Sequence, residues 1–530
     1  MKSASWNASR ATSWKWTPLL LGLTAVTACT SPDAARIAGT AASARAADPT
    51  PIDESLSRVV VDAGQTQGPV MRIERASTHS TSSPLPGEAT RSYMQSLDQD
   101  VVRTWVQVRY VYNKGNVDYN YKYDGSGVGA EDALKFYATT GKQVLIALSA
   151  YTPTSTWTLP KGDAFVQFLT QTLVHYKSAY PNVRYIQVGN EPDANDETMA
   201  TYYPIYRQYY QAVNAANAQL GLTGDDRLLI SNGPFTSNVN NMVTYARTFF
   251  AAYAADTSSD KRLDFFCFHV YGETDRPAEL ATARQRVEAA MADYGIAPVP
   301  LFVDEYGVFG GSTLPVRFTA ADLVTMQPAG QLTKAFYLYE SGIDRVFNWA
   351  IFHASLPMKS QVADVQTAVT YPYGRMLQLA HMVSERGTRI AATSSSINAQ
   401  GLGTHVLASM KTDGGIAVLV WNFNWRNTPP DSAFDVLIKN IPHAAVGGGH
   451  LRRTIYVIDS KTNNYYTNRS QTTLEPTSRD VVEYGSAVHV PLHLERQAVA
   501  LIVLEHASAA CEHRAAAADS SSQSGPNACD

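Results

Sequence analysis

The strongest constraint on the fold is a repeated alternation of short apolar runs and longer amphipathic stretches through the middle of this 530-residue chain. Eight runs have the length and apolar content of buried strands; they cover 69–73, 101–106, 143–148, 185–188, 227–230, 263–268, 300–303 and 345–347. Amphipathic stretches at 164–180, 202–220, 241–255, 278–294 and 323–341 repeat apolar residues at helical spacing. Strands alternating with helices indicate a parallel sheet, and eight such units predict an α/β fold of the (β/α)8 TIM-barrel type.

The pattern changes after a helical stretch at 373–384. Segments 405–410, 416–423, 434–439, 454–458, 487–492 and 498–504 are β-rich and are separated by Gly, Asn, Asp and Pro clusters. This pattern predicts an accessory C-terminal β-sandwich. The early run 57–62 precedes the first barrel strand, and we expect this N-terminal strand to join the same sandwich. Such a domain can brace the barrel or bind carbohydrate independently, and the lack of a separating linker favours bracing.

The two ends of the chain differ from the middle. Lys2, Arg10 and Lys15 precede an apolar stretch at 18–26 that is too short to span a membrane, which predicts a signal peptide over 1–29. Val26-Thr27-Ala28-Cys29 resembles a bacterial lipobox, so lipidated Cys29 is one expected membrane anchor. Ordinary cleavage nearby, or at 44–46, is the alternative. The protein is then exported from a bacterial cell as a periplasmic, outer-membrane or secreted protein.

These features predict six segments. They are the signal peptide 1–29, a flexible Ala/Ser/Pro-rich linker 30–54, the N-terminal sandwich strand 55–67, the barrel 68–378, the β-sandwich 379–508 and a polar tail 509–530. The net charge of -4 provides no basic field, so nucleic acid is not an expected partner. Cys267 lies in an apolar run and is expected to be buried, whereas Cys511 and Cys529 could close a local disulfide. No Cys/His spacing indicates a metal, and we expect no cofactor.

Two glutamates stand out because each follows a predicted strand, in Asn190-Glu191-Pro192 and in Asp304-Glu305. A lone glutamate is usually a solvated surface group or an ion-pair partner. The carboxyl ends of barrel strands, however, are where barrel enzymes place catalytic groups. Hydrolysis of a glycosidic bond needs such a pair, because one carboxyl group protonates the leaving oxygen while the other attacks the anomeric carbon or activates water.

Four motifs at predicted strand ends together resemble the clan A glycoside hydrolases: Asn190-Glu191-Pro192, His269-Val270-Tyr271, Asp304-Glu305-Tyr306 and Trp349. In that clan the acid/base follows the fourth strand and the nucleophile the seventh, which are the positions of Glu191 and Glu305 in the predicted order. The chain is most similar to glycoside hydrolase family 39, of β-xylosidases and α-L-iduronidases, whose barrel is coupled to a sandwich formed by both chain ends. The resemblance covers residues 55–506 and implies an oligo- or polysaccharide substrate.

By this resemblance, Glu191 is the acid/base and Glu305 the nucleophile of a retaining glycosidase. Retaining sites hold the two carboxyl groups about 5–5.5 Å apart, and the acid must carry a proton near neutral pH. We expect the negative charge of Glu305 to raise the pKa of Glu191 until the glycosyl-enzyme forms, after which Glu191 becomes the base.

Further residues are candidates for contact with the substrate. The resemblance implies that Asn190 binds the sugar 2-hydroxyl, that Tyr271 donates a hydrogen bond beside the nucleophile, and that Arg103 keeps the nucleophile ionised. His269 lies two residues before Tyr271 and so faces the same side of its strand. Three of these residues have a structural alternative: a turn cap for Asn190, an internal ion pair for Arg103, and core packing for His269.

Aromatic residues are candidates for sugar platforms. Trp349 is expected to stack on a pyranose ring, while Trp105 and Trp157 are weaker candidates for other subsites. The tyrosine-rich stretch 110–123 could wall a glycan groove, or it could be an ordinary surface loop. Asp304 departs from the family pattern, which more often has Thr before the glutamate. A regular strand points Asp304 away from Glu305, whereas a bulge would bring it to the site.

Three functions follow from these residues. The first is a retaining glycosidase, β-xylosidase-like or acting on a bacterial or plant glycan. The second is a non-catalytic carbohydrate-binding or transport-associated lipoprotein, which the presence of both glutamates disfavours. The third is an adhesin or matrix protein that binds through the sandwich, and its binding would survive loss of both glutamates.

Overall fold

The computed structural model describes residues 59–507 except 80–83, 114–115, 123–127, 130, 150–158, 195–197, 237, 312–313, 316, 426–431, 443–449 and 484–486. The predicted signal peptide 1–29, linker 30–54 and tail 509–530, with Cys29, Cys511 and Cys529, therefore lie outside the described residues. None of the helices in the described part of the chain has the length and apolar character needed to cross a membrane.

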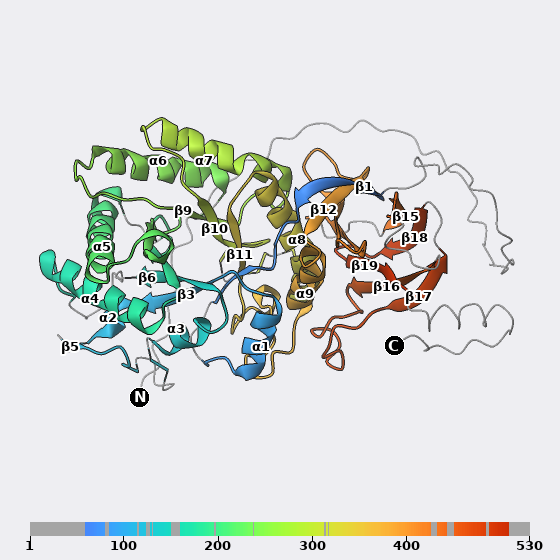
Figure 1. The fold of residues 1–530 in the computed structure, drawn as a ribbon, viewed down its shortest axis with the longest axis horizontal. Helices are drawn as coiled ribbons and strands as arrows, with labels where there is room; N and C mark the ends of the chain where they lie inside the picture. Colours follow the sequence, from blue (N-terminus) through green and yellow to red (C-terminus); the bar gives the residue numbers. More distant parts are fainter. Residues whose placement is uncertain are drawn as a thin grey trace. The chain divides into compact units, whose positions relative to one another are not determined.

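Eight parallel strands form the barrel predicted from the sequence (Figure 1). They are β2 (Ala76–Thr78), β3 (Val101–Gln107), β6 (Gln143–Ser149), β7 (Val183–Val188), β8 (Leu229–Ser231), β9 (Phe266–Val270), β10 (Leu301–Tyr306) and β11 (Arg345–Trp349). The sheet order is β8-β7-β6-β3-β2-β11-β10-β9, and a parallel bridge between Phe235 and Phe268 links its two edges. The barrel is nearly closed, with β7 as its fourth strand and β10 as its seventh.

The first barrel strand differs from its prediction. The run 69–73 was expected to form it, but Pro69 ends a sandwich strand, and the barrel strand is the three-residue β2, Ala76–Thr78. Val70 and Ile73 are buried, which explains the apolar signal, yet they lie in the connection between the two strands. β2 has little β propensity of its own, and its pairing with β3 and β11 defines it.

Helices surround the barrel and bury its outer face. They are α1 (Glu88–Ser96), α2 (Val108–Val111), α3 (Asp132–Tyr137), α4 (Asp163–Ala179), α5 (Met199–Gln219), α6 (Val239–Ala255), α7 (Ala283–Ala292), α8 (Ala320–Glu340) and α9 (Pro372–Ser384), with the 3-10 helices η2 (Gly224–Asp226), η3 (Pro277–Thr282) and η4 (Pro357–Lys359). The five predicted amphipathic stretches match α4 to α8 within a few residues, with η3 forming the start of the fourth. The outer core is rich in aromatic rings such as Tyr206, Phe249 and Phe266.

Among the described residues, the predicted β-sandwich comprises nine strands. They are β1 (Val59–Pro69), β12 (Thr388–Ser394), β13 (Gly403–Met410), β14 (Ile416–Phe423), β15 (Ser432–Lys439), β16 (His450–Ile458), β17 (Ser478–Glu483), β18 (Ala487–Leu494) and β19 (Val499–His506). Their order is β17-β16-β19-β14-β13-β12-β1-β15-β18. Side chains from both halves of this sheet, such as Val436 and Ile502, share one core, so the sheet folds over on itself.

The N-terminal strand joins the sandwich, as expected. β1 pairs antiparallel with β12 and parallel with β15, and therefore lies inside the sheet. Val59 and Val61 are fully buried, whereas the second half of the strand, from Gly64 to Pro69, is exposed. The predicted boundary at 378/379 lies within α9, and the chain passes from barrel to sandwich between Ser384 and Thr388.

One face of the sandwich packs on barrel helices α8 and α9. Trp421 of β14 is fully buried and donates its indole N–H to the Thr333 hydroxyl on α8 at 2.8 Å. Ser409 of β13 likewise donates to the carbonyl of Val383 on α9 at 2.7 Å. Trp421 and Phe423 belong to the same apolar core as the barrel helices. The sandwich thus buries a continuous apolar surface against the barrel.

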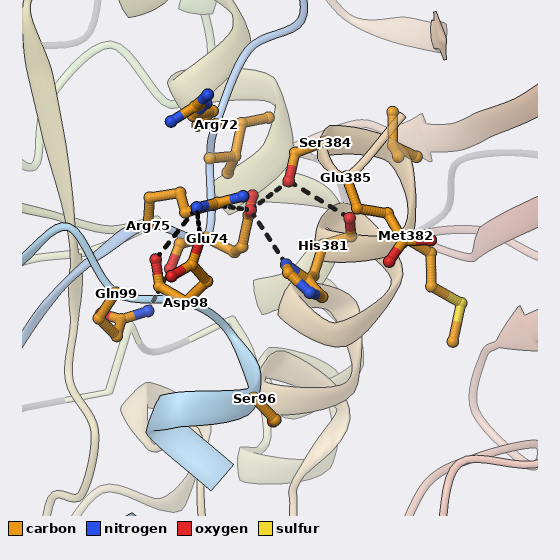
Figure 2. A network of polar contacts seen from close by, with 12 residues as sticks. Arg72, Glu74, Arg75, Ser96, Asp98, Gln99, His381, Met382, Ser384 and Glu385 are labelled. Atoms are coloured by element: carbon orange, nitrogen blue, oxygen red, sulfur yellow. Dashed lines mark hydrogen bonds and ion pairs between the residues drawn. The ribbon is translucent and has the colours of Figure 1, made fainter. Parts of the chain in front are cut away.

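The connection between β1 and β2 is held by a buried carboxylate (Figure 2). Glu74 is fully buried and accepts hydrogen bonds from Arg75 Nε at 3.0 Å and from the Ser384 hydroxyl on α9. Arg75 also pairs with Asp98, which follows α1. His381 Nδ1 of α9 lies 3.5 Å from the same Glu74 oxygen. These contacts connect the segment before the first barrel strand with α9, the helix on which the sandwich packs.

Candidate active site

Alternation along the strands aims one set of side chains into the barrel. Toward the amino ends of the strands, the inward-facing side chains are apolar. They include Val101, Tyr185, Phe265, Phe302 and Phe347, which form a core separate from the helix layer. Because alternate side chains of a strand face the same side, the next inward-facing side chain lies two residues further along each strand. At the carboxyl ends these inward positions become polar or indole-bearing, namely Arg103, Trp105, Gln187, His269, Asp304 and Trp349.

A bulge near the end of β10 brings Glu305 to this polar layer. Regular alternation from Phe302 turns Asp304 inward and Glu305 outward. The pairing with β9 shifts between Val303 and Glu305, however, so that Glu305 lies opposite His269. The extra residue lets both carboxylates contact Arg103. Asp304 and Glu305 therefore do not point apart as a regular strand would require.

Arg103 is the hub of the site. It is fully buried, and its Nη1 donates to Glu305 Oε1 at 2.7 Å while its Nη2 donates to Asn190 Oδ1 at 2.8 Å. Its Nε lies 2.9 Å from both Gln187 Oε1 and Asp304 Oδ2. Burial opposes its charge, but the carboxylates of Asp304 and Glu305 outweigh burial and raise the pKa of Arg103. The guanidinium thus joins three strand ends in one charged network.

Glu191 sits in a strained backbone position at the end of β7. Its φ of 46° lies in the left-handed region, after Gly189 with a φ of 78°. Its N–H donates to the carbonyl of Pro234 in the next loop at 3.1 Å, which holds this turn in place. A left-handed conformation costs a non-glycine residue about 1–2 kcal/mol, and such strain gathers at functional sites.

His269 and Glu191 form a coupled pair. His269 Nδ1 lies 2.7 Å from Glu191 Oε1, and His269 Nε2 lies 3.7 Å from both Asp304 and Glu305 oxygens. Burial alone would lower the pKa of His269, but the charges of Glu305 and Asp304 and the hydrogen bond to Glu191 raise it to about 10. Burial conversely raises the pKa of Glu191, and the hydrogen bond and charge of His269 outweigh burial and lower it.

This pair corrects one expectation. The charge of Glu305 was expected to raise the pKa of Glu191, but His269 lies in direct contact with Glu191 and its effect is larger. Near neutral pH the pair therefore holds one proton, located mainly on the imidazole. A transfer across 2.7 Å would place that proton on Glu191.

The two glutamates lie close enough to act on one anomeric carbon. One carboxylate oxygen of each, together with a ring nitrogen of His269, fall within 4.8 Å of one another. Tyr271 donates its hydroxyl to Glu305 Oε2 at 2.8 Å, and burial followed by the charge of Glu305 raises the pKa of this phenol. The Glu305 side chain is 5% exposed, whereas the Glu191 side chain is 25% exposed, so Glu191 is nearer the solvent.

The same three side chains could in principle hold a metal ion. Their donor atoms are already engaged, since Arg103 and Tyr271 donate to Glu305 while His269 contacts Glu191. A cation there would also lie next to the Arg103 guanidinium and a histidine whose pKa is raised. The arrangement suits proton exchange better than metal binding.

Two tryptophans border the charged layer. Trp105 and Trp349 are half-buried, and their ring centroids are 6.4 Å apart. The Arg103 guanidinium lies 4.9 Å from the Trp105 ring centroid. All eight predicted site residues are therefore joined by direct contacts into one cluster, although their individual roles stay predictions. Trp157 lies outside the described residues.

Two tyrosines of the 110–123 stretch, Tyr112 and Tyr119, pack toward helix α4. Tyr119 stacks on His175 with ring centroids 3.8 Å apart, and Tyr112 meets Phe168 edge-on at 5.1 Å. Short strands β4 (Tyr112–Asn113) and β5 (Asn116–Val117) form a hairpin here. These contacts anchor the hairpin, and its role as a groove wall stays a prediction.

Three polar residues of the site were not predicted. Gln187 bridges Arg103 and Asp304, and its signal was a lone polar residue within an apolar strand. Asp193 accepts from the Thr236 N–H, and burial raises its pKa to about 6. Lys359 is 4% exposed and its Nζ lies 5.3 Å from the Tyr271 ring centroid; burial lowers its pKa to about 8. No motif marks Lys359, because the fold of the loop after β11 alone brings it there.

Comparisons with known proteins give structural matches only. No family model and no curated protein sequence matches the chain. A glucosidase from Croceicoccus marinus superimposes with a TM-score of 0.63 at 16% identity, over 86% of this chain and 100% of its own. The GH39 enzyme from Xanthomonas axonopodis pv. citri follows with 0.60 at 15% identity, over 85% and 98%.

A monomeric β-xylosidase from Caulobacter crescentus matches with a TM-score of 0.57 at 14% identity, over 85% of this chain and 99% of that one. The shared architecture therefore extends over nearly the whole of each neighbour, barrel and sandwich together. The fold implied by the resemblance to family 39 is confirmed.

Proposed function

We propose that this protein is a retaining glycoside hydrolase that cleaves an oligo- or polysaccharide through a covalent glycosyl-enzyme. The observation that carries the proposal is the pair of glutamates whose nearest oxygens, with His269, lie within 4.8 Å. Retaining enzymes hold their carboxyl groups about 5–5.5 Å apart, whereas inverting enzymes need about 6.5–9.5 Å to admit a water molecule. The glycosidases among its structural neighbours support the same reaction class.

In the first step Glu305 attacks the anomeric carbon and forms an ester, while Glu191 protonates the departing glycosidic oxygen. Arg103 and Tyr271 each donate to one oxygen of Glu305 and so orient it for attack. Asn190 accepts from Arg103 through its side-chain oxygen, and its amide N–H2 is the donor proposed for a sugar hydroxyl. Trp349 provides an aromatic face for the ring.

His269 supplies the proton reserve for this step. At rest the imidazole holds the one proton of the pair; this proton moves to Glu191, and Glu191 passes it to the leaving oxygen, which leaves His269 neutral and Glu191 ionised. Ester formation in the same step removes the negative charge of Glu305, which lowers the proton affinity of His269 and so favours this transfer. In the second step Glu191 accepts a proton from water, the oxygen of that water bonds to the anomeric carbon as the ester bond to Glu305 breaks, and the sugar leaves with retained configuration.

Export, with attachment through lipidated Cys29 as one route, is part of the proposal and rests on the N-terminal residues alone. A β-xylosidase-like activity and hydrolysis of an exopolysaccharide or plant glycan are the two substrate ranges proposed. A non-catalytic carbohydrate-binding or adhesin-type surface lipoprotein is the alternative that the test below must separate.

The test compares hydrolysis by three forms of a protein lacking residues 1–50. They are the wild type, the Glu191→Gln/Glu305→Gln variant, and a control with two exposed glutamates changed, Glu88→Gln/Glu483→Gln. Each is screened on aryl glycosides and polysaccharides. Sugar release by wild type and control, but not by the site variant, is the expected result. Binding without release that is unchanged in the site variant would favour the adhesin or binding protein.

Azide tests the covalent step separately. The Glu305→Ala variant should stay folded and lose turnover, because no nucleophile remains. Added azide should restore it and yield a glycosyl azide whose anomeric configuration is inverted relative to the substrate. Undiminished activity in Glu305→Ala, or an azide product of retained configuration, would remove the assignment of Glu305 as nucleophile.

A further inference from the structure

Lys334 of α8 is a fully buried cation behind the active site. Its Nζ donates to the carbonyl of Gly272 at 2.6 Å and to the carbonyl of Gly307 at 2.7 Å. No ion pair to Lys334 exists among the residues that the structure describes. Burial lowers its pKa to about 7, against the opposing charges of Glu273 and Asp275. A buried lysine without an ion-pair partner is costly, so its position calls for an explanation.

The two carbonyls belong to the segments that carry Tyr271 and Glu305. Gly272 directly follows Tyr271 after β9, and Gly307 lies two residues beyond Glu305 after β10. Carbonyls beyond the end of a parallel strand lack the partners that the sheet provides, and they need donors from elsewhere. One ammonium group therefore joins the two strand ends.

The Tyr271 ring rests on the same segment of backbone. A Cβ atom at Gly307 would lie 3.3 Å from Tyr271 Cε1, and one at Gly310 would lie 3.2 Å from Tyr271 Cβ. The backbone of residues 307–310 therefore packs against the Tyr271 ring. The hydroxyl of this ring donates to Glu305 Oε2 at 2.8 Å. Gln331, one turn before Lys334 on α8, donates to the carbonyl of Tyr306 at 3.2 Å and so fixes the backbone directly before Gly307.

We propose that Lys334 is a positioning residue that joins the ends of β9 and β10 and thereby holds Tyr271 against Glu305. This inference rests on the proposed glycosidase function, and it adds a residue that does not touch the substrate. Without the ammonium group, the segments after β9 and β10 separate, and the Tyr271 hydroxyl loses its hydrogen bond to Glu305. The loss falls on the chemical step, because the proposed sugar contacts Asn190 and Trp349 lie elsewhere, after β7 and at the end of β11.

The chain contains a matched control. Lys177 of α4 is also buried, and its Nζ also donates to two carbonyls, of Pro181 at 2.6 Å and of Val183 at 2.9 Å. These lie before and at the start of β7, at the opposite end of the barrel from the site. Lys177→Met therefore removes the same kind of interaction without touching the ends of β9 and β10.

The test measures kcat and KM for Lys334→Met, Tyr271→Phe, their double variant and Lys177→Met, on the aryl glycoside that the wild type hydrolyses best. We expect Lys334→Met to lower kcat by about ten- to a hundredfold with KM nearly unchanged. The double variant should match Tyr271→Phe within about threefold, because both changes act through one contact. Lys177→Met should keep the wild-type kcat. Losses that multiply in the double variant would overturn the proposal.

A crystal structure of Lys334→Met separates this inference from the proposed function. Displacement of the Tyr271 hydroxyl from Glu305 supports the inference even if no glycoside is hydrolysed, and a retained hydrogen bond overturns it. If Lys334→Met does not fold, Lys334→Gln replaces it in both measurements, since glutamine keeps a donor but cannot reach both carbonyls. The same two outcomes then decide.

Discussion

Glu191 combines a strained backbone with a proton-sharing partner, and its proposed role as the acid predicts how its loss depends on the substrate. In Glu191→Ala, the first step on glycosides with poor leaving groups should slow by about 10²–10⁴-fold, because these oxygens need protonation in order to leave. Glycosides with good leaving groups should lose far less in that step. Pre-steady-state rates across a series of aryl glycosides measure this dependence. An equal loss across the series would show that Glu191 is not the acid.

The His269–Glu191 pair predicts the alkaline limit of activity. With the pKa of His269 raised to about 10, the proton of the pair is retained until the pH approaches that value. In His269→Gln, Glu191 must hold the proton without the imidazole, and the ordinary pKa of a glutamate is only about 4.3. The alkaline limb of kcat/KM should therefore move to lower pH in this variant.

The control for this pH profile is His381→Gln, which removes a histidine beside the buried Glu74, away from the site. Its alkaline limb should match that of the wild type. An unmoved limb in His269→Gln would contradict the proton reserve.

Single residues were predictable where they occupied strand ends, and less so where geometry was irregular. Glu191, His269 and Tyr271 followed recognisable strands, so their convergence could be predicted. The contact of Asp304 with Arg103 depends on a bulge in β10, and a sequence read with strict alternation places Asp304 and Glu305 on opposite faces. Lys334 and Lys359 carry no local signal, because segments distant in the chain determine their surroundings.

At the scale of elements, α8 is packed too closely at Gly330 to accept a side chain. A Cβ atom there would lie 2.1 Å from Val308 Cγ1 and 3.0 Å from Phe423 Cε2. Alanine in an open helix position gains up to about 1 kcal/mol over glycine, but overpacking typically costs about 1–3 kcal/mol. Gly330→Ala should therefore lower the free energy of unfolding by about 1–2 kcal/mol, measured by urea denaturation.

A second glycine provides the control for this change. At Gly415 the nearest atom to an added Cβ is 3.4 Å away, which is ordinary contact, so Gly415→Ala should change the free energy of unfolding little. A stabilised Gly330→Ala would mean that α8 shifts without cost and that its contact with the sandwich is loose.

The elements differ in how well the sequence marks them. Long strands with buried faces, such as β14 and β19, were predicted nearly to their ends. β12 and β17 were missed because Thr, Arg, Ser and Asp dilute their apolar pattern, and β17 lies at the edge of its sheet, where polar residues are tolerated. β2 is defined by its neighbours. Pairing partners, rather than propensity, define these three strands.

At the scale of the whole molecule, packing of β14 on α8 predicts that barrel and sandwich unfold together. Val61 of β1 is fully buried in the sandwich core, far from the candidate site in the fold. Val61→Ala should cost about 2 kcal/mol by leaving a cavity. Loss of enzymatic activity and loss of far-UV circular dichroism in urea should shift to lower denaturant by the same amount.

Gln67→Ala, at an exposed position of the same strand, is the control and should leave both midpoints in place. Activity that persists at urea concentrations where part of the far-UV circular dichroism signal is already lost would show that the barrel is stable alone.

The position of β1 inside the sandwich also imposes an order on biosynthesis. Val59 pairs with Ser394 and with Val436, so the strand made first must wait for partners that leave the ribosome only after the entire barrel. During that interval both of its hydrogen-bonding edges are open to unwanted pairing with other chains. The polar, glycine-flanked half from Gly64 to Gly68 limits this hazard, because half of the waiting strand offers no apolar side chains to a neighbour.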